Sequence, residues 1–253
     1  MCLIVFAYKT VPGTPLVLIG NRDEFYKRPA KKAHIWETDP PIVAGKDIKA
    51  GGTWLGLSAF RRMAAITNFR DMGSIKPDAP SRGDIVKNAL ISSVSIEEYL
   101  QNLQKEAQNY NGFNLITGSL EKLFFFSNQT MNIEELKPGV YVLSNALLNT
   151  PWPKAEWAKE RFKEILTSEN STANDYFSLL TNSNTYPTED LPETGLSKEM
   201  EKAVSPVFIN TKDYGTRCST VLQLFDDKTF YLEERTYDTE TKDVESKQVY
   251  TQF

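Results

Sequence analysis

Residues that could carry out chemistry stand at the start of this chain and at the ends of its apolar segments. Cys2 directly follows Met1, and an initiator methionine is usually removed when the next side chain is small. Cys2 would then hold a thiol and a free α-amine on one residue. The thiolate is a strong nucleophile, and an α-amine with a pKa of about 7.7–8.0 can act as its base. The alternative interpretation is a small apolar residue that opens a strand.

Other polar residues adjoin apolar runs and could line the same site. They are Arg22 and Asp23 after Leu16–Ile19, Asn68 after Met63–Thr67, Asn145 after Val140–Ser144, and Arg217 before Ser219–Phe225. An arginine near a thiol lowers its pKa, and a carboxylate can hold an amine in place. Asparagine amides can donate to an oxyanion, which contributes about 2.7–4 kcal/mol to transition-state stabilisation. Each of these residues can also be an ordinary turn or strand-end residue.

A hairpin predicted at the start of the chain would bring the first of these groups to Cys2. Leu3–Tyr8 and Leu16–Ile19 are apolar runs, and Val11–Thr14 between them contains the Pro and Gly typical of a turn. Antiparallel partners start and finish side by side. We therefore expect the Gly20–Glu24 segment to lie beside Cys2.

The rest of the pattern predicts hairpins, then helices, then further strands. Strands are expected at Ile42–Ala44, Gly51–Ser58, Met63–Asn68, Asn111–Gly118, Lys122–Ser127, Val140–Ser144, Pro206–Asn210, Ser219–Phe225, Thr229–Glu234 and Val249–Phe253, and helices from Ser81, at Ser95–Ala107, Trp152–Leu166 and Ala173–Leu180. Arg28–Pro41 and Thr181–Glu193 are expected to be exposed connections. This segregated order favours α+β over alternating βαβ, and we expect a single domain over residues 1–253.

Composition argues against several classes of protein. The net charge of −4 over 253 residues gives no general attraction to nucleic acid or to an anionic membrane. Cys2 and Cys218 make no disulfide framework and indicate a reducing compartment. The sole histidine, His34, is expected on a surface loop, which argues against a Ser-His-Asp triad and against His-rich zinc sites. We expect a soluble, cytoplasmic protein without a secretory signal, metal cluster or cofactor.

One further motif is excluded as a binding site, and two further features have two interpretations each. Gly51 and Gly52 are not a phosphate loop, because no Gly-Lys-Ser/Thr follows. Cys218 is either a second reactive thiol or a buried residue at a strand start. The basic Lys27–Lys32 segment is a partner surface or simply a solvated loop.

Several motifs in order make the chain similar to a known family. They are Gly20-Asn-Arg-Asp-Glu24, Gly51-Gly-Thr-Trp-Leu-Gly56, Ile66-Thr-Asn-Phe-Arg70, Ser81-Arg-Gly83, Tyr110-Asn-Gly-Phe-Asn114, Leu143-Ser-Asn145 and Thr216-Arg-Cys-Ser-Thr220. Over most of its length the chain resembles the NRDE family, also called transport and Golgi organisation protein 2-like. The Asn21–Glu24 tetrapeptide is the most telling motif.

More distantly, the pattern is similar to the N-terminal-nucleophile amidases penicillin V acylase and bile salt hydrolase. That resemblance implies a four-layer αββα sandwich and a cysteine exposed by methionine removal. By motif, the matching catalytic residues are Cys2 as nucleophile, Arg22 and Asp23 as the arginine and aspartate, Asn68 and Asn145 as oxyanion and substrate-orienting groups, and Arg217 as the late arginine.

One departure from the amidases concerns the spacing of arginine and aspartate, which are adjacent here and further apart there. Neighbours on one strand point to opposite faces. Only one of Arg22 and Asp23 is therefore expected to face Cys2, with Asn21 or Glu24 as a substitute for the other.

Three hypotheses about function follow. The first is a cysteine N-terminal-nucleophile hydrolase that cleaves a linear C–N amide through Cys2. The second is a carrier or regulator of a hydrophobic ligand, such as an acyl chain or haem, which the resemblance associates with lipid homeostasis, secretory and Golgi organisation and haem trafficking. The third is a vestigial site in an interaction protein. The expected partner is a small-molecule amide or a hydrophobic ligand, with no nucleic acid and no stable membrane insertion; substrate and oligomeric state stay open.

Overall fold

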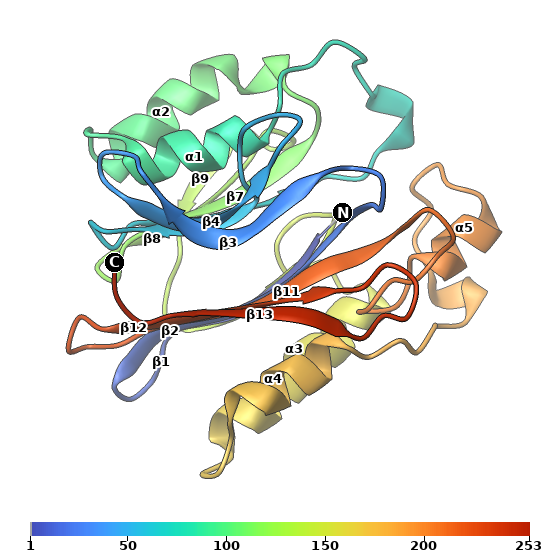
Figure 1. Cartoon of the computed structure of the whole chain (residues 1–253). Coiled ribbons are helices and arrows are strands. Elements are labelled where there is room, and N and C mark those ends of the chain that lie inside the picture. Colours follow the sequence, from blue (N-terminus) through green and yellow to red (C-terminus); the bar gives the residue numbers. More distant parts are fainter. Residues whose placement is uncertain (1) are drawn as a thin grey trace. The chain divides into compact units, whose positions relative to one another are not determined.

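The computed structural model describes residues 2–253, and this part of the chain divides into two compact units (Figure 1). The first unit takes the described residues up to Lys27 and then Pro138–Gln252, and the second takes Arg28–Lys137 with Phe253. Each unit contains one antiparallel sheet, which confirms the α+β class. The single domain over residues 1–253 stays a prediction, and the expected removal of Met1 lies outside the described residues.

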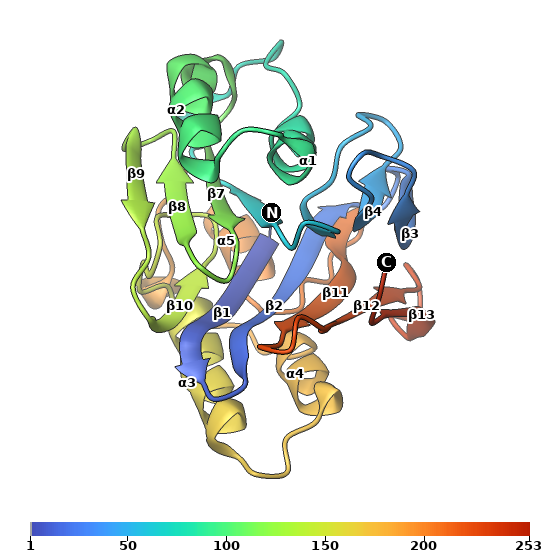
Figure 2. The same ribbon diagram turned by 90° about the vertical axis from the view of Figure 1, so that its left-hand side faces the viewer.

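The first unit contains a sheet with the strand order β10-β1-β2-β11-β12-β13. Its strands are β1 (Cys2–Val11), β2 (Thr14–Phe25), β10 (Gly139–Leu143), β11 (Tyr214–Leu224), β12 (Phe230–Tyr237) and β13 (Val244–Tyr250). Its helices are α3 (Pro153–Thr167), α4 (Ala173–Leu180) and α5 (Lys198–Ala203), and a 3-10 turn covers Thr188–Asp190. Both views show α3 and α4 on one face of β1 and β2 (Figure 2).

Alternation along β1 and β2 decides which side chains meet these helices. Leu3, Val5 and Ala7 pack with Val17 and Ile19 in one buried cluster that also contains side chains of α3 and α4. The even-numbered residues of β1, including Cys2, lie on the opposite face, since successive side chains of a strand point to alternate faces. The apolar helix face and the odd-numbered residues of β1 thus fix the side of the sheet on which the Cys2 side chain lies.

Local signals explain where the two helices begin. α3 starts with Pro153 at its first position, where the missing N–H costs no hydrogen bond. α4 begins with a capping box, in which Thr172 and Asp175 satisfy one another's backbone N–H groups. The two helices that begin at these positions pack together, and the ring centroids of Phe162 in α3 and Tyr176 in α4 are 5.7 Å apart.

The second unit contains a sheet with the strand order β3-β4-β5-β6-β7-β8-β9. Its strands are β3 (Ala30–Trp36), β4 (Ile42–Asp47), β5 (Leu55–Ser58), β6 (Met63–Asn68), β7 (Phe113–Gly118), β8 (Leu123–Ser127) and β9 (Asn132–Glu135). Its helices are α1 (Gly83–Ile91) and α2 (Ile96–Glu106), with 3-10 turns at Met72–Ser74 and Ala107–Asn109. Figure 1 shows α1 and α2 together over this sheet.

Two contacts hold α1 in the second unit. At its start, the Gly51–Gly52 loop packs so closely that a Cβ on Gly52 would lie 2.3 Å from the carbonyl carbon of Gly83. At its end, the Arg62 guanidinium donates to the carbonyls of Ala89, Ser92 and Val94 at 2.8–3.2 Å. A cation on the last carbonyls of a helix also complements the helix dipole.

Some predicted elements differ from the structure. The loop predicted at Arg28–Pro41 contains strand β3, in which His34 is half-buried and stacks on Trp36 with centroids 5.9 Å apart. Two lysines at its start hid this strand, although one face of it is apolar. Pro206–Asn210 forms no strand, apart from an isolated bridge between Asn210 and Gly215.

Other predicted strands are too short. β2 continues through Gly20–Glu24, so Arg22 and Asp23 lie within the strand rather than after it. β11 begins at Tyr214, so Arg217 also lies within a strand. Arg22 has strand partners on both of its sides, Cys2 on β1 and Cys218 on β11, and pairing outweighs weak strand propensity. β9 and α5 were not expected at all.

Candidate active site

Cys2 lies at the start of β1 with a polar residue beside it on the neighbouring strand. The ladder between β1 and β2 pairs Cys2 directly with Arg22. Directly paired residues share a face of the sheet, so these two side chains lie together. On the other flank, β10 pairs Leu143 with Ile4, and Asn145 follows two residues after the end of β10.

Arg22 stands between the two cysteines. It pairs with Cys2 on β1 and with Cys218 on β11. Its Nη2 lies 3.7 Å from Oε2 of Glu24, two residues along the same strand. Of the adjacent pair Arg22 and Asp23, the side chain on the Cys2 face is therefore that of Arg22.

The Cys2 thiol is buried, with 8% of the residue exposed. Burial raises its pKa above the ordinary value and the charge of Asp23 adds to the rise, whereas the Arg22 charge and a hydrogen bond from the Asp23 backbone N–H lower the pKa. Because burial is the largest of these effects, the thiol is protonated at neutral pH. A reaction at this sulfur therefore needs a base that removes its proton.

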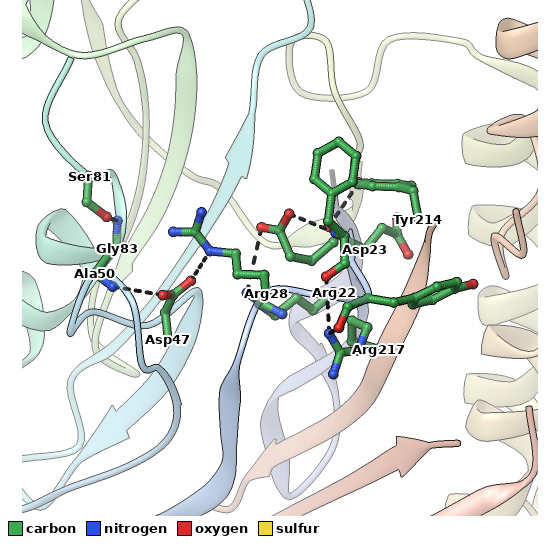
Figure 3. A network of polar contacts seen from close by, with 12 residues as sticks. Arg22, Asp23, Arg28, Asp47, Ala50, Ser81, Gly83, Tyr214 and Arg217 are labelled. Carbon is green, nitrogen blue, oxygen red and sulfur yellow. Dashed lines mark hydrogen bonds and ion pairs between the residues drawn. The ribbon is translucent and has the colours of Figure 1, made fainter. Parts of the chain in front are cut away.

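Asp23 is almost fully buried and is held at both its backbone and its side chain. Its carboxylate accepts a hydrogen bond from Oγ1 of Thr216 at 2.7 Å, and its carbonyl accepts one from the Tyr214 hydroxyl at 2.9 Å (Figure 3). Burial raises the pKa of the Asp23 carboxyl, and the charge of Lys154 and the Thr216 hydrogen bond lower it. Asp23 can thus present a carboxylate at the helix-facing side of the chain start.

Lys154 supplies one of the positive charges that act on Asp23. It lies near the start of α3, is only 4% exposed, and donates from Nζ to the Val204 carbonyl at 2.9 Å. A buried ammonium needs hydrogen bonds and a negative charge near it. Lys154 is therefore part of the polar surroundings of Asp23.

Asn21 does not replace either member of the pair, and the alternative that Glu24 does so stays a prediction. Asn21 points to the helix side, where its Nδ2 donates to the carbonyls of Leu180 and Val207 at 2.8 and 2.9 Å. Its Oδ1 accepts from the Ser219 hydroxyl at 2.6 Å. Asn21 thus ties the sheet to the end of α4, which is a structural role.

Arg217 occupies a bulge in β11. Thr216 pairs with Asp23 while Cys218 pairs with Arg22, so one residue of β11 is unmatched. Its Nη1 donates to the carbonyls of Phe25 and Tyr26 at 3.2 and 3.0 Å. Burial and the neighbouring Arg22 charge lower the pKa of Arg217. The two hydrogen bonds from Arg217 to the Phe25 and Tyr26 carbonyls hold the end of β2.

The two predicted asparagines lie in different units. Asn145 follows β10 in the first unit and is 1% exposed. Asn68 ends β6 in the second unit, where it pairs with Phe113 and is half-buried. The expectation that Asn68 acts together with Cys2 stays a prediction.

Cys218 has a different environment from Cys2. Both cysteines are free thiols. Burial raises the pKa of Cys218 well above its ordinary value, and the charge of Glu234 and a hydrogen bond to it raise the pKa further. The structure therefore supports the interpretation of Cys218 as a buried residue rather than as a second reactive thiol.

Sequence reasoning missed three residues around Asp23, namely Tyr214, Thr216 and Lys154. Thr216 begins the Thr216–Thr220 motif, so its motif membership was a usable signal. Tyr214 stands two residues before it on the same strand. Nothing in the local pattern marks Lys154, because a lysine on an amphipathic helix is ordinarily exposed.

The described residues contain no group of His, Cys, Asp and Glu that could hold a metal ion. Within the same part of the chain, every helix is too short or too polar to cross a bilayer.

Comparison with solved structures defines the class of fold. Penicillin V acylase from Agrobacterium tumefaciens is similar over 96% of this chain and 84% of its own, with a TM-score of 0.50 and 12% identity. A Caenorhabditis elegans N-acylethanolamine-hydrolyzing acid amidase is similar over 87% and 92%, with a TM-score of 0.50 and 14% identity. The fold is that of the N-terminal-nucleophile amidohydrolases, as the resemblance of the sequence implied.

The family follows from the sequence match. A family model described as Transport and Golgi organisation 2 matches residues 1–239. The Transport and Golgi organization 2 homolog of Mus musculus is 34% identical over 244 residues, which is 88% of either chain. The Drosophila melanogaster Transport and Golgi organization protein 2 is 29% identical over 261 residues, or 92% of either chain. The chain belongs to the Transport and Golgi organisation 2 family.

Proposed function

We propose that this protein is a cysteine N-terminal-nucleophile hydrolase that cleaves a linear amide bond, with Cys2 as nucleophile after removal of Met1. The observation that carries the proposal is the pairing of Cys2 with Arg22 on the neighbouring strand. The fold shared with amidohydrolases supports it.

The electrostatics of the site support a mechanism in which the amino terminus is the base. The buried thiol holds its proton at neutral pH, and a free α-amine on the same residue can accept it. The sulfur then attacks the amide carbonyl carbon, and the carbonyl oxygen becomes an oxyanion. Asn145 would donate to that oxyanion, a contribution of about 2.7–4 kcal/mol for one donor.

Breakdown of the intermediate completes the reaction. The C–N bond breaks, the leaving amine takes the proton held by the α-amine, and the acyl group stays on sulfur as a thioester. Water, deprotonated by the same α-amine, then attacks the thioester, and the acid leaves as the thiol regains its proton. Asp23, whose carboxylate is held by Thr216, would anchor the α-amine through these steps.

Mass spectrometry and turnover test this proposal together. Intact mass is expected to show a chain that begins with Cys2, and N-acylethanolamines and penicillin V serve as probe amides. Cys2→Ala should abolish hydrolysis while the protein still folds, and Cys218→Ala is the matched control that should retain it. A chain that keeps Met1 and hydrolyses none of the probes would refute the hydrolase.

The burial of the thiol favours a second candidate, a carrier of a hydrophobic ligand. A protonated, buried thiol is unreactive, and acyl chains or haem are the ligand classes of this alternative, with roles in lipid homeostasis, Golgi organisation or haem trafficking. Fluorescent acyl-chain binding separates the two, since Cys2→Ala should leave carrier binding nearly unchanged. A reducing compartment such as the cytoplasm suits a free thiol at position 2 in either case.

A further inference from the structure

The two strands at one edge of the second sheet carry basic side chains on a common face. β3 is the edge strand and β4 is its neighbour (Figure 2). Their ladder pairs Lys31 with Lys46, and it pairs His34 with Ala44, two positions before Lys46. Directly paired residues share a face of the sheet, and so do residues two positions apart on one strand. Lys31, His34 and Lys46 therefore lie on the same face.

The Lys46 ammonium is held in place on this face. Its Nζ lies 4.7 Å from the centroid of the Trp36 ring, which is a cation–π contact. The Trp36 ring is fixed in turn, because its Nε1 donates to the Ala44 carbonyl at 2.9 Å and only 6% of the residue is exposed. The position of this cation is thus set before any ligand binds.

His34 adds a ring whose two nitrogens have different roles. The ring stacks on Trp36, with centroids 5.9 Å apart. Its Nδ1 lies 2.9 Å from the Lys32 carbonyl, and since a carbonyl can only accept, Nδ1 carries a hydrogen. Nε2 is therefore the nitrogen that a ligand can use, and in the neutral ring it accepts a hydrogen bond.

No carboxylate balances the two lysines. Neither Lys31 nor Lys46 forms an ion pair with a carboxylate anywhere in residues 2–253. Asp47 follows Lys46 on the opposite face of β4 and pairs with Arg28. Like charges directly opposite one another on neighbouring strands are destabilising. An anion between the two ammonium groups would relieve that repulsion.

Helix α1 lies on the same side of the sheet and supplies no balancing charge. A Cβ on Gly56 would lie 2.8 Å from Cδ1 of Leu90 in α1 and 3.0 Å from the Cβ of Ala44, so Ala44 and α1 share a side. Asp84, the acidic residue of α1, pairs with Lys87 at 2.9 Å. The basic cluster is thus on the helix-bearing face of the second unit.

We propose that Lys31, His34 and Lys46 form a binding site for inorganic phosphate. The hydrogen phosphate ion has two negative charges and one P–OH group. Its charges match the two ammonium groups, which bind phosphate oxygens as point charges, and its hydroxyl donates to Nε2 of the neutral His34 ring. The site lies within the second unit and makes no use of Cys2. It therefore goes beyond the proposed hydrolysis and is tested apart from it.

The first test follows the Cε1–H signal of His34 by NMR in the untagged protein at pH 8. The chain contains a single histidine, so this signal is unambiguous. Titration with sodium phosphate should move it to saturation, whereas sodium chloride at equal ionic strength should not. A shift that fails to saturate, or one that chloride reproduces, would overturn the proposal.

Two variants remove the charges one at a time, with affinity measured from the backbone amide signals of β3 and β4. Lys31→Gln and Lys46→Gln should each weaken phosphate binding about tenfold, since each removes one charge-assisted hydrogen bond. Lys49→Gln is the matched control, because this exposed lysine follows β4 and lies outside the cluster. Lys31 is also exposed, so its variant keeps the test valid if Lys46→Gln does not fold. Unchanged affinity in Lys31→Gln, or an equal loss in Lys49→Gln, would refute the site.

Sulfate and glycerol 3-phosphate test the choice of ligand. Both have two negative charges at pH 8 but no hydrogen that Nε2 could bind. They should bind more weakly than phosphate to the wild type. His34→Phe, which keeps a ring on Trp36 without a nitrogen, should remove this preference. Equal affinity of the wild type for all three anions would contradict the assignment to inorganic phosphate.

Discussion

Arg22 pairs with Cys2 across the β1–β2 ladder, and its charge lowers the pKa of a thiol that burial raises. The same guanidinium also lowers the pKa of Cys218 on the other side. One cation thus serves two thiols on the same face of the sheet. Which thiol reacts is decided by their other neighbours.

Replacing Arg22 should slow the reaction of Cys2. Without the guanidinium, Arg22→Gln should raise the thiol pKa, so alkylation at pH 8 should fall several-fold. The measurement is the rate of iodoacetamide labelling by mass spectrometry. Arg161→Gln is the control, since this exposed arginine of α3 pairs with Glu164 at 2.6 Å. Equal rates in wild type and Arg22→Gln would contradict the electrostatic role of Arg22.

In the wild type, Cys2 should be labelled before Cys218. Burial and Glu234 raise the pKa of Cys218, whereas Cys2 receives a hydrogen bond from the Asp23 N–H. Glu234→Gln should remove the unfavourable charge and speed labelling of Cys218 about tenfold. Peptide mapping after brief labelling checks both statements. Faster labelling of Cys218 than of Cys2 in the wild type would refute the first.

Asp23 should lower the stability of the fold at neutral pH. Its folded-state pKa is raised, chiefly by burial, so the folded chain binds the proton more tightly than the unfolded chain. The stabilisation from this proton is complete below the unfolded pKa of about 3.9 and is lost as pH rises through the folded value. Relative to the wild type, Asp23→Asn should therefore gain free energy of unfolding between pH 4 and pH 7, in addition to a loss at both pH values from the negative charge that it removes near Lys154.

Urea denaturation at pH 7 and pH 4 measures this effect. The gain from Asp23→Asn should shrink at the lower pH, where the wild-type carboxyl is protonated as well. Asp226→Asn, in the exposed turn between β11 and β12, is the control and should change stability little. A gain of the same size at both pH values would rule out the titration of Asp23 as its cause.

Glu233 should have the opposite dependence on pH. Burial acts to raise its pKa, but hydrogen bonds from Tyr231, Arg235 and Lys247 outweigh burial and lower it. Its stabilisation is complete above the unfolded pKa of about 4.3 and is lost as pH falls through the folded value. Glu233→Gln should lower the free energy of unfolding at pH 7 by about 2 kcal/mol, with a smaller difference in acid.

The control for Glu233 is an exposed glutamate with one partner. Glu160 of α3 pairs with Lys163 at 2.7 Å, and its side chain is 67% exposed. Glu160→Gln should change stability by less than about 0.5 kcal/mol. If Glu233→Gln and Glu160→Gln lowered the free energy of unfolding by similar amounts, the buried hydrogen bonds of Glu233 would contribute no more to stability than an exposed ion pair.

A methyl group at Gly52 should displace the start of α1. The added Cβ would lie 2.3 Å from the Gly83 carbonyl carbon. That carbon is a backbone atom, so the clash can be relieved only by a shift of the main chain. Gly52→Ala should lower stability by about 1–3 kcal/mol. Gly73→Ala is the control, since its Cβ would meet only a side-chain oxygen of Asp71 at 3.4 Å. Thermal melting compares the two, and equal melting temperatures would contradict the close packing.

The hairpin and the class of fold were predictable because their signals are local. The Leu3–Tyr8 and Leu16–Ile19 runs with a Pro-Gly turn between them fix an antiparallel pair, and that pair brings Arg22 opposite Cys2. The motifs at Asn21–Glu24 and Thr216–Thr220 carried the family, which the matches confirm. The prediction of the hairpin depends only on residues that are close in sequence, and the prediction of the family depends only on the order of motifs along the chain.

Strand ends and buried polar partners were not predictable in the same way. β2 was expected to stop before Asn21 and β11 to begin after Arg217, yet each continues because the other lies beside it. Strand β3 was missed because its lysines mark one face as exposed and the burial of Ala33 and Trp36 depends on the sheet around them. Pairing between distant segments decides such boundaries.

By itself, the order of residues determined that a thiol opens the first strand and that a guanidinium meets it across a hairpin. Only the tertiary structure decided that Tyr214, Thr216 and Lys154 surround Asp23, the neighbour of that guanidinium in the chain. The physical reason is distance along the chain. Residues more than a hundred positions apart bury one carboxylate, and burial and hydrogen bonding, which set its charge, exist only once those segments pack.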